Sequence, residues 1–72
     1  MTLKEARPGE RVRVVASGPG RSLAGIGIHT GDVLVVMRAA PFGGPLLVEA
    51  PSGARVAIGR SVAAGVHVEP SR

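Results

Sequence analysis

Residues 33–58 read VLVVMRAAPFGGPLLVEAPSGARVAI, with three short apolar runs separated by two turns rich in proline and glycine. The runs are 33–37, 46–50 and 54–58. Short apolar runs bounded by such turn residues are typical of β-strands. The first run is apolar throughout, which indicates a strand that is covered on both faces or strongly bent. The other two runs flank the short turn 51–53 and predict a hairpin.

Two more strands are predicted on either side of this stretch. Residues 11–16 alternate between arginine and valine up to Ala16, so that the even-numbered positions share one apolar face. Residues 66–69 read VHVE and alternate in the same way. A period of two is characteristic of a half-buried strand. Residues 8–9, a proline and a glycine, predict a turn at which we expect the ordered part of the chain to begin.

Residues 21–26 differ from the strands because Leu23 and Ile26 are three positions apart, which suits about two turns of helix. Gly27 stands where a left-handed residue would end that helix. Ile28 is then expected to fold back onto Leu23 as the apolar contact of the helix end. Residues 59–65 can hold one further helical turn.

The chain has 72 residues, with 11 glycines, 6 prolines and no cysteine. A chain of this size buries only about 60% of its unfolded surface. Without cysteine it has neither disulfides nor zinc–thiolate sites. Closing a short sheet into a barrel satisfies the edge strands internally. Five short strands with glycine-rich corners and one short helix therefore predict an all-β fold, a small barrel formed as a single domain by residues 1–72.

The formal net charge is +4, and Lys4 is the one lysine among the basic residues. The arginines are scattered singly among acids, which favours solvated strand faces; a small basic barrel that binds nucleic acid stays open as an alternative. The first seven residues carry charges where an export signal needs an apolar core. No segment reaches the roughly 20 apolar residues of a membrane span. We therefore expect a cytoplasmic protein that does not insert directly into a membrane.

Two segments carry recognisable motifs. Residues 21–32 (RSLAGIGIHTGD) contain a basic residue and leucine, an aliphatic–glycine–aliphatic step and a later glycine. Residues 39–45 (AAPFGGP) form a loop similar to the pattern Ala-Pro-x-Gly-x-Pro. Both segments resemble the FeoA family, whose members are cytoplasmic accessory proteins of bacterial ferrous iron transport. Weaker agreement extends from Leu3 to residues 66–68, so the resemblance covers nearly the whole chain.

The chain departs from the family pattern at three places. Ser22 stands where members often have a second arginine, and Thr30 stands where they commonly have proline. After Arg60 the acidic residue that members usually carry is missing. These departures affect the expected surface chemistry more than the expected fold.

The resemblance implies an SH3-like barrel that works beside the membrane permease FeoB and touches its cytoplasmic G-protein region. The same kind of barrel occurs as the C-terminal effector domain of DtxR-like metal-dependent repressors, which provides a further alternative for this chain. The sequence leaves open whether the chain associates with copies of itself.

The segment around the predicted helix, together with the proline-rich loop, is the candidate partner-binding surface. Interface anchors are commonly aliphatic, aromatic or arginine side chains with a polar rim. Phe42 is the only aromatic residue, and in a loop it is either folded back over the barrel or presented to a partner. The aliphatic residues can equally plug one end of the barrel. The candidate partner-binding residues are Arg21, Leu23, Ile26, Ile28, His29 and Phe42.

Catalysis and metal binding find little support in the residue pattern. Serines and acids are dispersed, so neither a nucleophile–base pair nor a carboxylate pair is indicated. Residues 18–20 precede the predicted helix but lack the lysine of a phosphate-binding P-loop. His67 and Glu69 would point to one side of a strand, but two ligands do not make a metal site. We therefore expect no enzyme activity, no cofactor and no dedicated metal site, since the family's link to iron does not require this chain to bind the metal.

Overall fold

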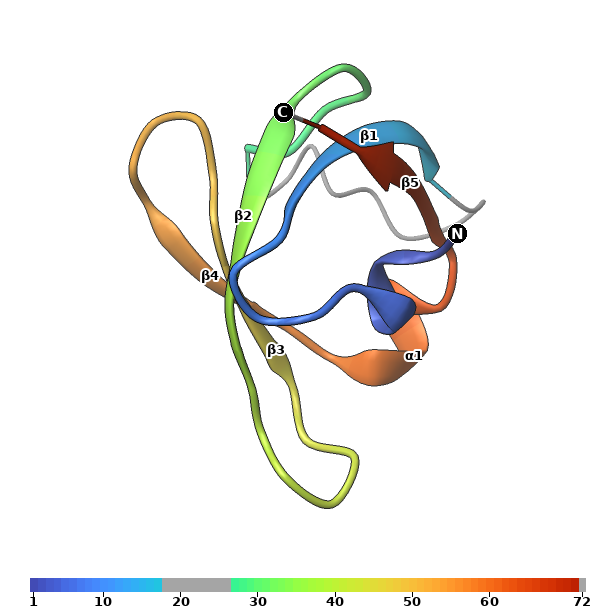
Figure 1. Ribbon diagram of the computed structural model, residues 1–72, viewed down its shortest axis with the longest axis vertical. Helices are drawn as coiled ribbons and strands as arrows, with labels where there is room; N and C mark the ends of the chain where they lie inside the picture. The colour runs from blue at the N-terminus through green and yellow to red at the C-terminus, as the bar shows by residue number, and fades with distance from the viewer. Residues whose placement is uncertain (18–26, 72) are drawn as a thin grey trace.

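The structure, a computed structural model, describes residues 1–17 and 27–71 of the chain. Five strands form an antiparallel sheet in the order β4-β3-β2-β1-β5. The strands are β1 (Arg11–Ser17), β2 (Val33–Ala39), β3 (Leu46–Glu49), β4 (Arg55–Ile58) and β5 (Val66–Pro70). The helical elements of these residues are a 3₁₀ helix, η1 (Leu3–Glu5), and an α-helix, α1 (Arg60–Ala63). Figure 1 shows that the sheet curls strongly around the interior, which makes the fold a small all-β barrel as predicted.

The local predictions from the sequence are largely confirmed. Each predicted strand is present, with bounds that differ by at most two residues at either end. The helical turn predicted within residues 59–65 is α1. Gly27 has a φ of 83°, in the left-handed region where it was expected. The helix predicted at residues 21–26 lies outside the described residues, as does the expected contact between Leu23 and Ile28.

The core lies between the inner face of the curled sheet and the two helical elements. Leu3 of η1 and Ala63 of α1 are fully buried in the same cluster as the strand residues. Figure 1 shows η1 and α1 side by side, with α1 linking β4 to β5. Burying each large aliphatic side chain contributes about 1.5–3 kcal/mol. The inward-facing strand residues, none more than 3% exposed, are Val12, Val14, Leu34, Val36, Leu46, Val48, Ile58, Val66 and Val68.

Two irregularities in the strand pairing break the alternation of the strands. The register shifts after Val14, where β1 pairs with β5, and after Val36, where β2 pairs with β3. The extra residues, Val15 and Met37, are 48% and 36% exposed. A β-bulge increases local twist and bends the strand, as closing a small barrel requires. The alternation predicted for residues 11–16 is therefore wrong at Ala16, which is exposed.

The N-terminal segment belongs to the folded structure, so the prediction that order begins at the proline–glycine turn is wrong. Thr2 forms a β-bridge with His67. The N–H of Val68 donates a hydrogen bond to the carbonyl oxygen of Met1 at 2.8 Å. The side chain of Leu3 is fully buried. The sequence did not predict this element because a three-residue 3₁₀ helix is too short to show a hydrophobic period. It is nevertheless held in the fold, since it places a large aliphatic side chain in the core.

Candidate docking surface

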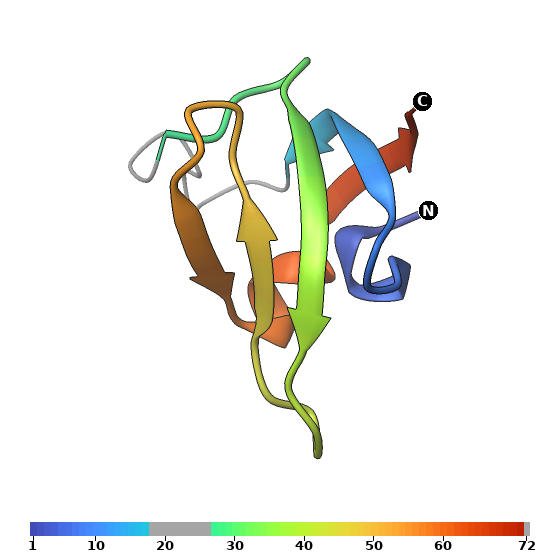
Figure 2. The ribbon, with the colours of Figure 1, turned by 60° about the vertical axis from the view of Figure 1, so that its left-hand side comes forward.

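Residues 40–45 join β2 to β3, and we call them the β2–β3 tip. Figure 2 shows this yellow-green loop projecting beyond the lower end of the sheet. The N–H of Ala40 donates to the carbonyl oxygen of Pro45 at 3.0 Å. The N–H of Gly44 donates to the carbonyl oxygen of Pro41 at 3.1 Å. These two hydrogen bonds close the loop as a tight hairpin connection.

Phe42 and Gly43 occupy the centre of this turn with positive φ angles of 58° and 76°. Two successive positive φ angles are characteristic of a type I′ turn, which favours asparagine, aspartate and glycine at both central positions. The left-handed conformation costs a residue with a side chain about 1–2 kcal/mol. Among the described residues, Phe42 is the only one other than glycine with a positive φ. Its backbone conformation therefore opposes stability.

The ring of Phe42 is fully exposed, with a relative accessibility of 104%. The ring is therefore not folded back over the barrel. An aromatic ring in water forgoes the stabilisation that burial would give it. A strained backbone that holds a fully exposed aromatic ring is a reason to look for a functional contact at that position.

Arg60, the first residue of α1, holds the base of the tip. Its Nε–H donates to the carbonyl oxygen of Gly44 at 2.8 Å, and a terminal N–H donates to the carbonyl oxygen of Ala40 at 3.2 Å. The planar guanidinium suits this role because its donors have a fixed geometry. No local sequence pattern indicates this contact, since its partners lie 16 and 20 positions apart along the chain.

Close packing inside the tip requires glycine at position 44. A Cβ atom there would lie 2.6 Å from the Cβ of Ala40 and 3.2 Å from the carbonyl oxygen of Pro41. Such distances are shorter than van der Waals contact, which begins near 3.5 Å between carbon atoms. The base of the tip is thus tightly packed and hydrogen-bonded, while the ring of Phe42 stands in solvent.

The other predicted contact residues lie elsewhere or are not described. Arg21, Leu23 and Ile26 fall outside the described residues. Ile28 is 2% exposed and belongs to the core cluster, so its side chain fills the barrel instead of facing a partner. Only His29 and Phe42 of the predicted set are described and exposed.

His29 begins the turn that precedes β2. Its N–H donates to Oδ2 of Asp32 at 2.9 Å, and its Nδ1 lies 3.7 Å from the same oxygen. The N–H of Asp32 donates back to the carbonyl oxygen of His29 at 3.0 Å. The seven residues of β2 separate this turn from the β2–β3 tip, which corresponds to roughly 23 Å of strand. The structure therefore does not bring His29 and Phe42 into one contact site.

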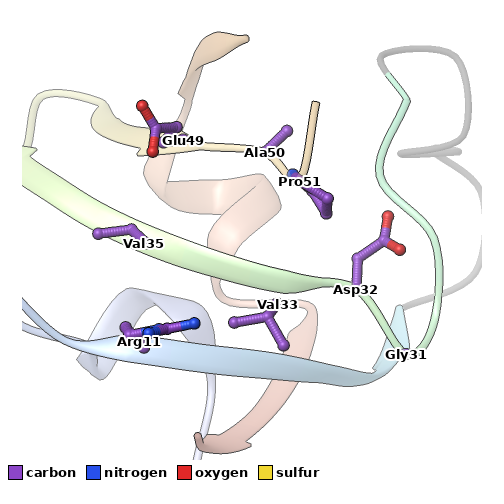
Figure 3. A pocket seen from close by; sticks show the side chains of 8 residues that line it. All are labelled: Arg11, Gly31, Asp32, Val33, Val35, Glu49, Ala50 and Pro51. Carbon is purple, nitrogen blue, oxygen red and sulfur yellow. The ribbon is translucent and has the colours of Figure 1, made fainter. Parts of the chain in front are cut away.

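A depression on the outer face of the sheet lies beside β2 (Figure 3). Its volume is about 430 Å³, and its lining residues are Arg11, Gly31, Asp32, Val33, Val35, Glu49, Ala50 and Pro51. Arg11, Val35 and Glu49 are cross-strand neighbours on β1, β2 and β3. One guanidinium and two carboxylates therefore surround half-buried valines, so the negative charges of the lining outnumber the positive one. The sequence did not predict this depression because its lining comes from three separate segments.

The histidine and the carboxylate of β5 have different environments. His67 is exposed, whereas Glu69 forms an ion pair with Arg13 of β1. In the part of the chain that the structure describes, no three His, Cys, Asp or Glu side chains gather closely enough to hold a metal ion. The same residues include no buried polar or charged side chain of the kind that acid–base catalysis commonly uses.

The helices found in residues 1–17 and 27–71 include none with the length and apolar character needed to cross a membrane.

Comparison with known proteins identifies the family. The profile of the FeoA domain matches residues 1–70. The chain is similar to a crystal structure of the iron uptake regulatory protein FeoA, with 30% identity and a TM-score of 0.86 over 99% of this chain and 96% of that one. It is also similar to the FeoA protein from Chlorobium tepidum, with 28% identity and a TM-score of 0.88 over 100% of this chain and 71% of that one.

A third similar structure is Stenotrophomonas maltophilia FeoA complexed with zinc, which is named a prokaryotic SH3 domain protein. Its identity is 26% and its TM-score 0.79, over 96% of this chain and 89% of that one. The SH3-like type of the barrel is thereby confirmed. Comparison with curated protein sequences found no match. FeoA domains are associated with ferrous iron transport, in which they are accessory proteins. The match over residues 1–70 shows that the chain belongs to the FeoA family.

Proposed function

We propose that this chain is a cytoplasmic, non-enzymatic accessory protein that binds the cytoplasmic G-protein region of a FeoB-like permease and so acts on ferrous iron transport. Membership of the FeoA family supports the link to transport. The observation that carries the proposed contact is Phe42, a fully exposed aromatic ring on a strained and braced turn. Such a ring is a natural anchor for another protein.

A docking role fits the described surface better than a chemical one. The described residues include no buried polar side chain and no group of three metal-ligating side chains. The depression beside β2 is open, and its lining combines Arg11 with two carboxylates and apolar residues. The β2–β3 tip, in contrast, combines an exposed apolar group with a backbone held by hydrogen bonds.

Binding of nucleic acid is the less supported alternative. Basic barrels that bind single strands stack bases on aromatic side chains, each worth about 1–3 kcal/mol, and this chain has one aromatic residue. Arg13 is paired with Glu69, so its charge is offset. A gel shift with single- and double-stranded DNA and RNA tests this alternative. We expect no complex at about 0.15 M salt.

Calorimetric titration of the isolated cytoplasmic region of the permease with this chain tests the proposed function. We expect saturable binding with a Kd of about 1–100 μM, the range of a transient contact with a small interface. The absence of saturable binding at chain concentrations up to about 1 mM would contradict the proposal.

A further inference from the structure

We propose that the β2–β3 tip inserts the ring of Phe42 into an apolar pocket of the permease's cytoplasmic region, and that carboxylates rim this pocket. The inference rests on the proposed function and specifies the residues through which the two proteins meet. It assigns Phe42 as the anchor, Arg60 as the residue that positions the tip, and Arg38 as the charge that faces the rim.

The tip is arranged for insertion before a partner arrives. The ring of Phe42 is exposed, while the backbone beneath it is held by the bonds from Arg60 to Gly44 and Ala40. Ordering a loop during association weakens binding, so a loop that is ordered in advance favours it. Aromatic rings give a large contact area with few rotatable bonds, which makes them frequent anchors of interfaces.

The charges near the tip indicate an acidic partner. Residues 33–48 contain no acidic residue, and Arg38 is exposed near the end of β2. The acidic residue Glu10 is hydrogen-bonded to β2, because its carbonyl oxygen accepts a hydrogen bond from the N–H of Val36. Its carboxylate accepts a hydrogen bond from the N–H of Arg7. Because opposite charges steer proteins together and like charges separate them, a pocket rimmed by carboxylates fits this end of the barrel.

The size of the contact favours a transient complex with a different protein over a dimer of this chain. A buried aromatic side chain contributes about 150–250 Å². A stable interface buries about 1,200–2,000 Å² in total. Two copies would also bring together two chains with a net charge of +4 each. The tip therefore fits a pocket in an acidic partner better than the surface of a second copy.

Titrations of the permease region with three chains separate this inference from the proposed function. We expect Phe42→Leu to keep the Kd within about threefold of the wild-type value and Phe42→Ala to raise it at least about tenfold. A wild-type chain that does not bind would remove the proposed function and this inference together. Normal wild-type binding with unchanged binding of Phe42→Ala would overturn this inference alone.

Two charge reversals test the acidic rim. Arg38→Glu reverses a charge at the end of β2, next to the tip. Arg55→Glu reverses a charge at the start of β4, beside the turn that joins β3 to β4 at the opposite end of β3 from the tip. We expect Arg38→Glu to raise the Kd at least about fivefold and Arg55→Glu to raise it less than about twofold. Equal effects of the two variants would overturn the proposed rim. Circular dichroism verifies that both variants are folded before they are compared.

Other occupants of the tip are tested with the chain alone and with lipid. Sedimentation equilibrium of the wild type and of Phe42→Ala is expected to give the same molecular mass. Co-sedimentation with vesicles of phosphatidylcholine and phosphatidylglycerol is expected to be equal for both chains. Self-association or vesicle binding that is lost in Phe42→Ala would overturn the proposal of a protein pocket.

Discussion

The Nε–H of Arg60 donates a hydrogen bond to the carbonyl oxygen of Gly44 at 2.8 Å and so ties α1 to the β2–β3 tip, 16 residues earlier in the chain. A terminal N–H of the same guanidinium reaches the carbonyl oxygen of Ala40. Because the two segments are distant in sequence, this contact requires the folded barrel. The exposed tip thus depends on the packed part of the molecule.

Replacing Arg60 removes both donors from the tip. We expect Arg60→Met, which keeps an apolar stem, to lower the free energy of unfolding by about 1–2 kcal/mol, since two partly buried carbonyl oxygens lose their partners. Urea denaturation measures this change. Arg60→Lys keeps a charge and one donor group, so its loss is expected to be smaller. Equal stability of Arg60→Met and the wild type would show that the guanidinium does not brace the tip.

A methyl group at position 44 would collide with the base of the tip. We expect Gly44→Ala to lower the free energy of unfolding by about 1–3 kcal/mol because its Cβ would lie 2.6 Å from that of Ala40. Gly59→Ala is the matched control. Gly59 has a φ of −63°, and a Cβ added to it would have no described atom within 4 Å. Its substitution is expected to change stability by less than about 1 kcal/mol. Equal losses from both changes, measured in urea, would contradict the packing at position 44.

Phe42 is expected to lower the stability of the fold while it strengthens binding to the permease region. We expect Phe42→Asn to raise the free energy of unfolding by about 1 kcal/mol, because asparagine tolerates the left-handed conformation of the turn. The same variant is expected to weaken binding to the permease region at least about tenfold. Thermal melting and calorimetry measure the two effects. A loss of stability would mean that the ring packs on its own chain.

Glu5 makes the stability of the N-terminal segment dependent on pH. The carboxylate of Glu5 accepts one hydrogen bond from the N–H of Thr2 at 2.7 Å and another from the hydroxyl of Thr2 at 3.2 Å. These bonds hold the pKa of Glu5 below its ordinary value of 4.5. Because the pKa of Glu5 is lower in the folded chain than in the unfolded chain, its carboxylate stabilises the fold at pH values above the unfolded-state pKa. This stabilisation is lost as the pH falls through the folded-state pKa.

Melting temperatures measured between about pH 3 and pH 7 test this dependence on Glu5. We expect Glu5→Gln to have a lower Tm than the wild type near neutral pH, and the difference to disappear in acid as the wild-type carboxylate takes up its proton. A difference in Tm that stays constant across the range would show that the charge of Glu5 plays no part.

The strands could be predicted from the sequence because apolar period and turn chemistry are local properties. The run 33–37, the hairpin turn 51–53 and the alternation of residues 66–69 each indicate their structure within a few residues. The β-bulges after Val14 and Val36 could not be predicted in this way, because they depend on the curvature of the whole sheet.

The candidate site could be predicted only in part. Phe42 was a candidate because it is the only aromatic residue of the chain. Its exposure depends on the conformation of the turn, which is set by positive φ angles at Phe42 and Gly43. The brace from Arg60 joins segments that no local pattern relates. The sequence also grouped His29 with Phe42, whereas the full length of β2 separates them. Residues 21–26, the remaining part of the predicted surface, stay a prediction.

Chemical-shift mapping of this chain during titration with the permease's cytoplasmic region tests docking at the tip most directly. The largest shifts of the backbone N–H signals are expected at residues 38–40 and 42–44, since Pro41 and Pro45 have no N–H. The ring protons of Phe42 are expected to lose their solvent-exposed character. Shifts that centre on the turn at His29 or on the depression beside Val35, with residues 40–45 unchanged, would contradict docking through the β2–β3 tip.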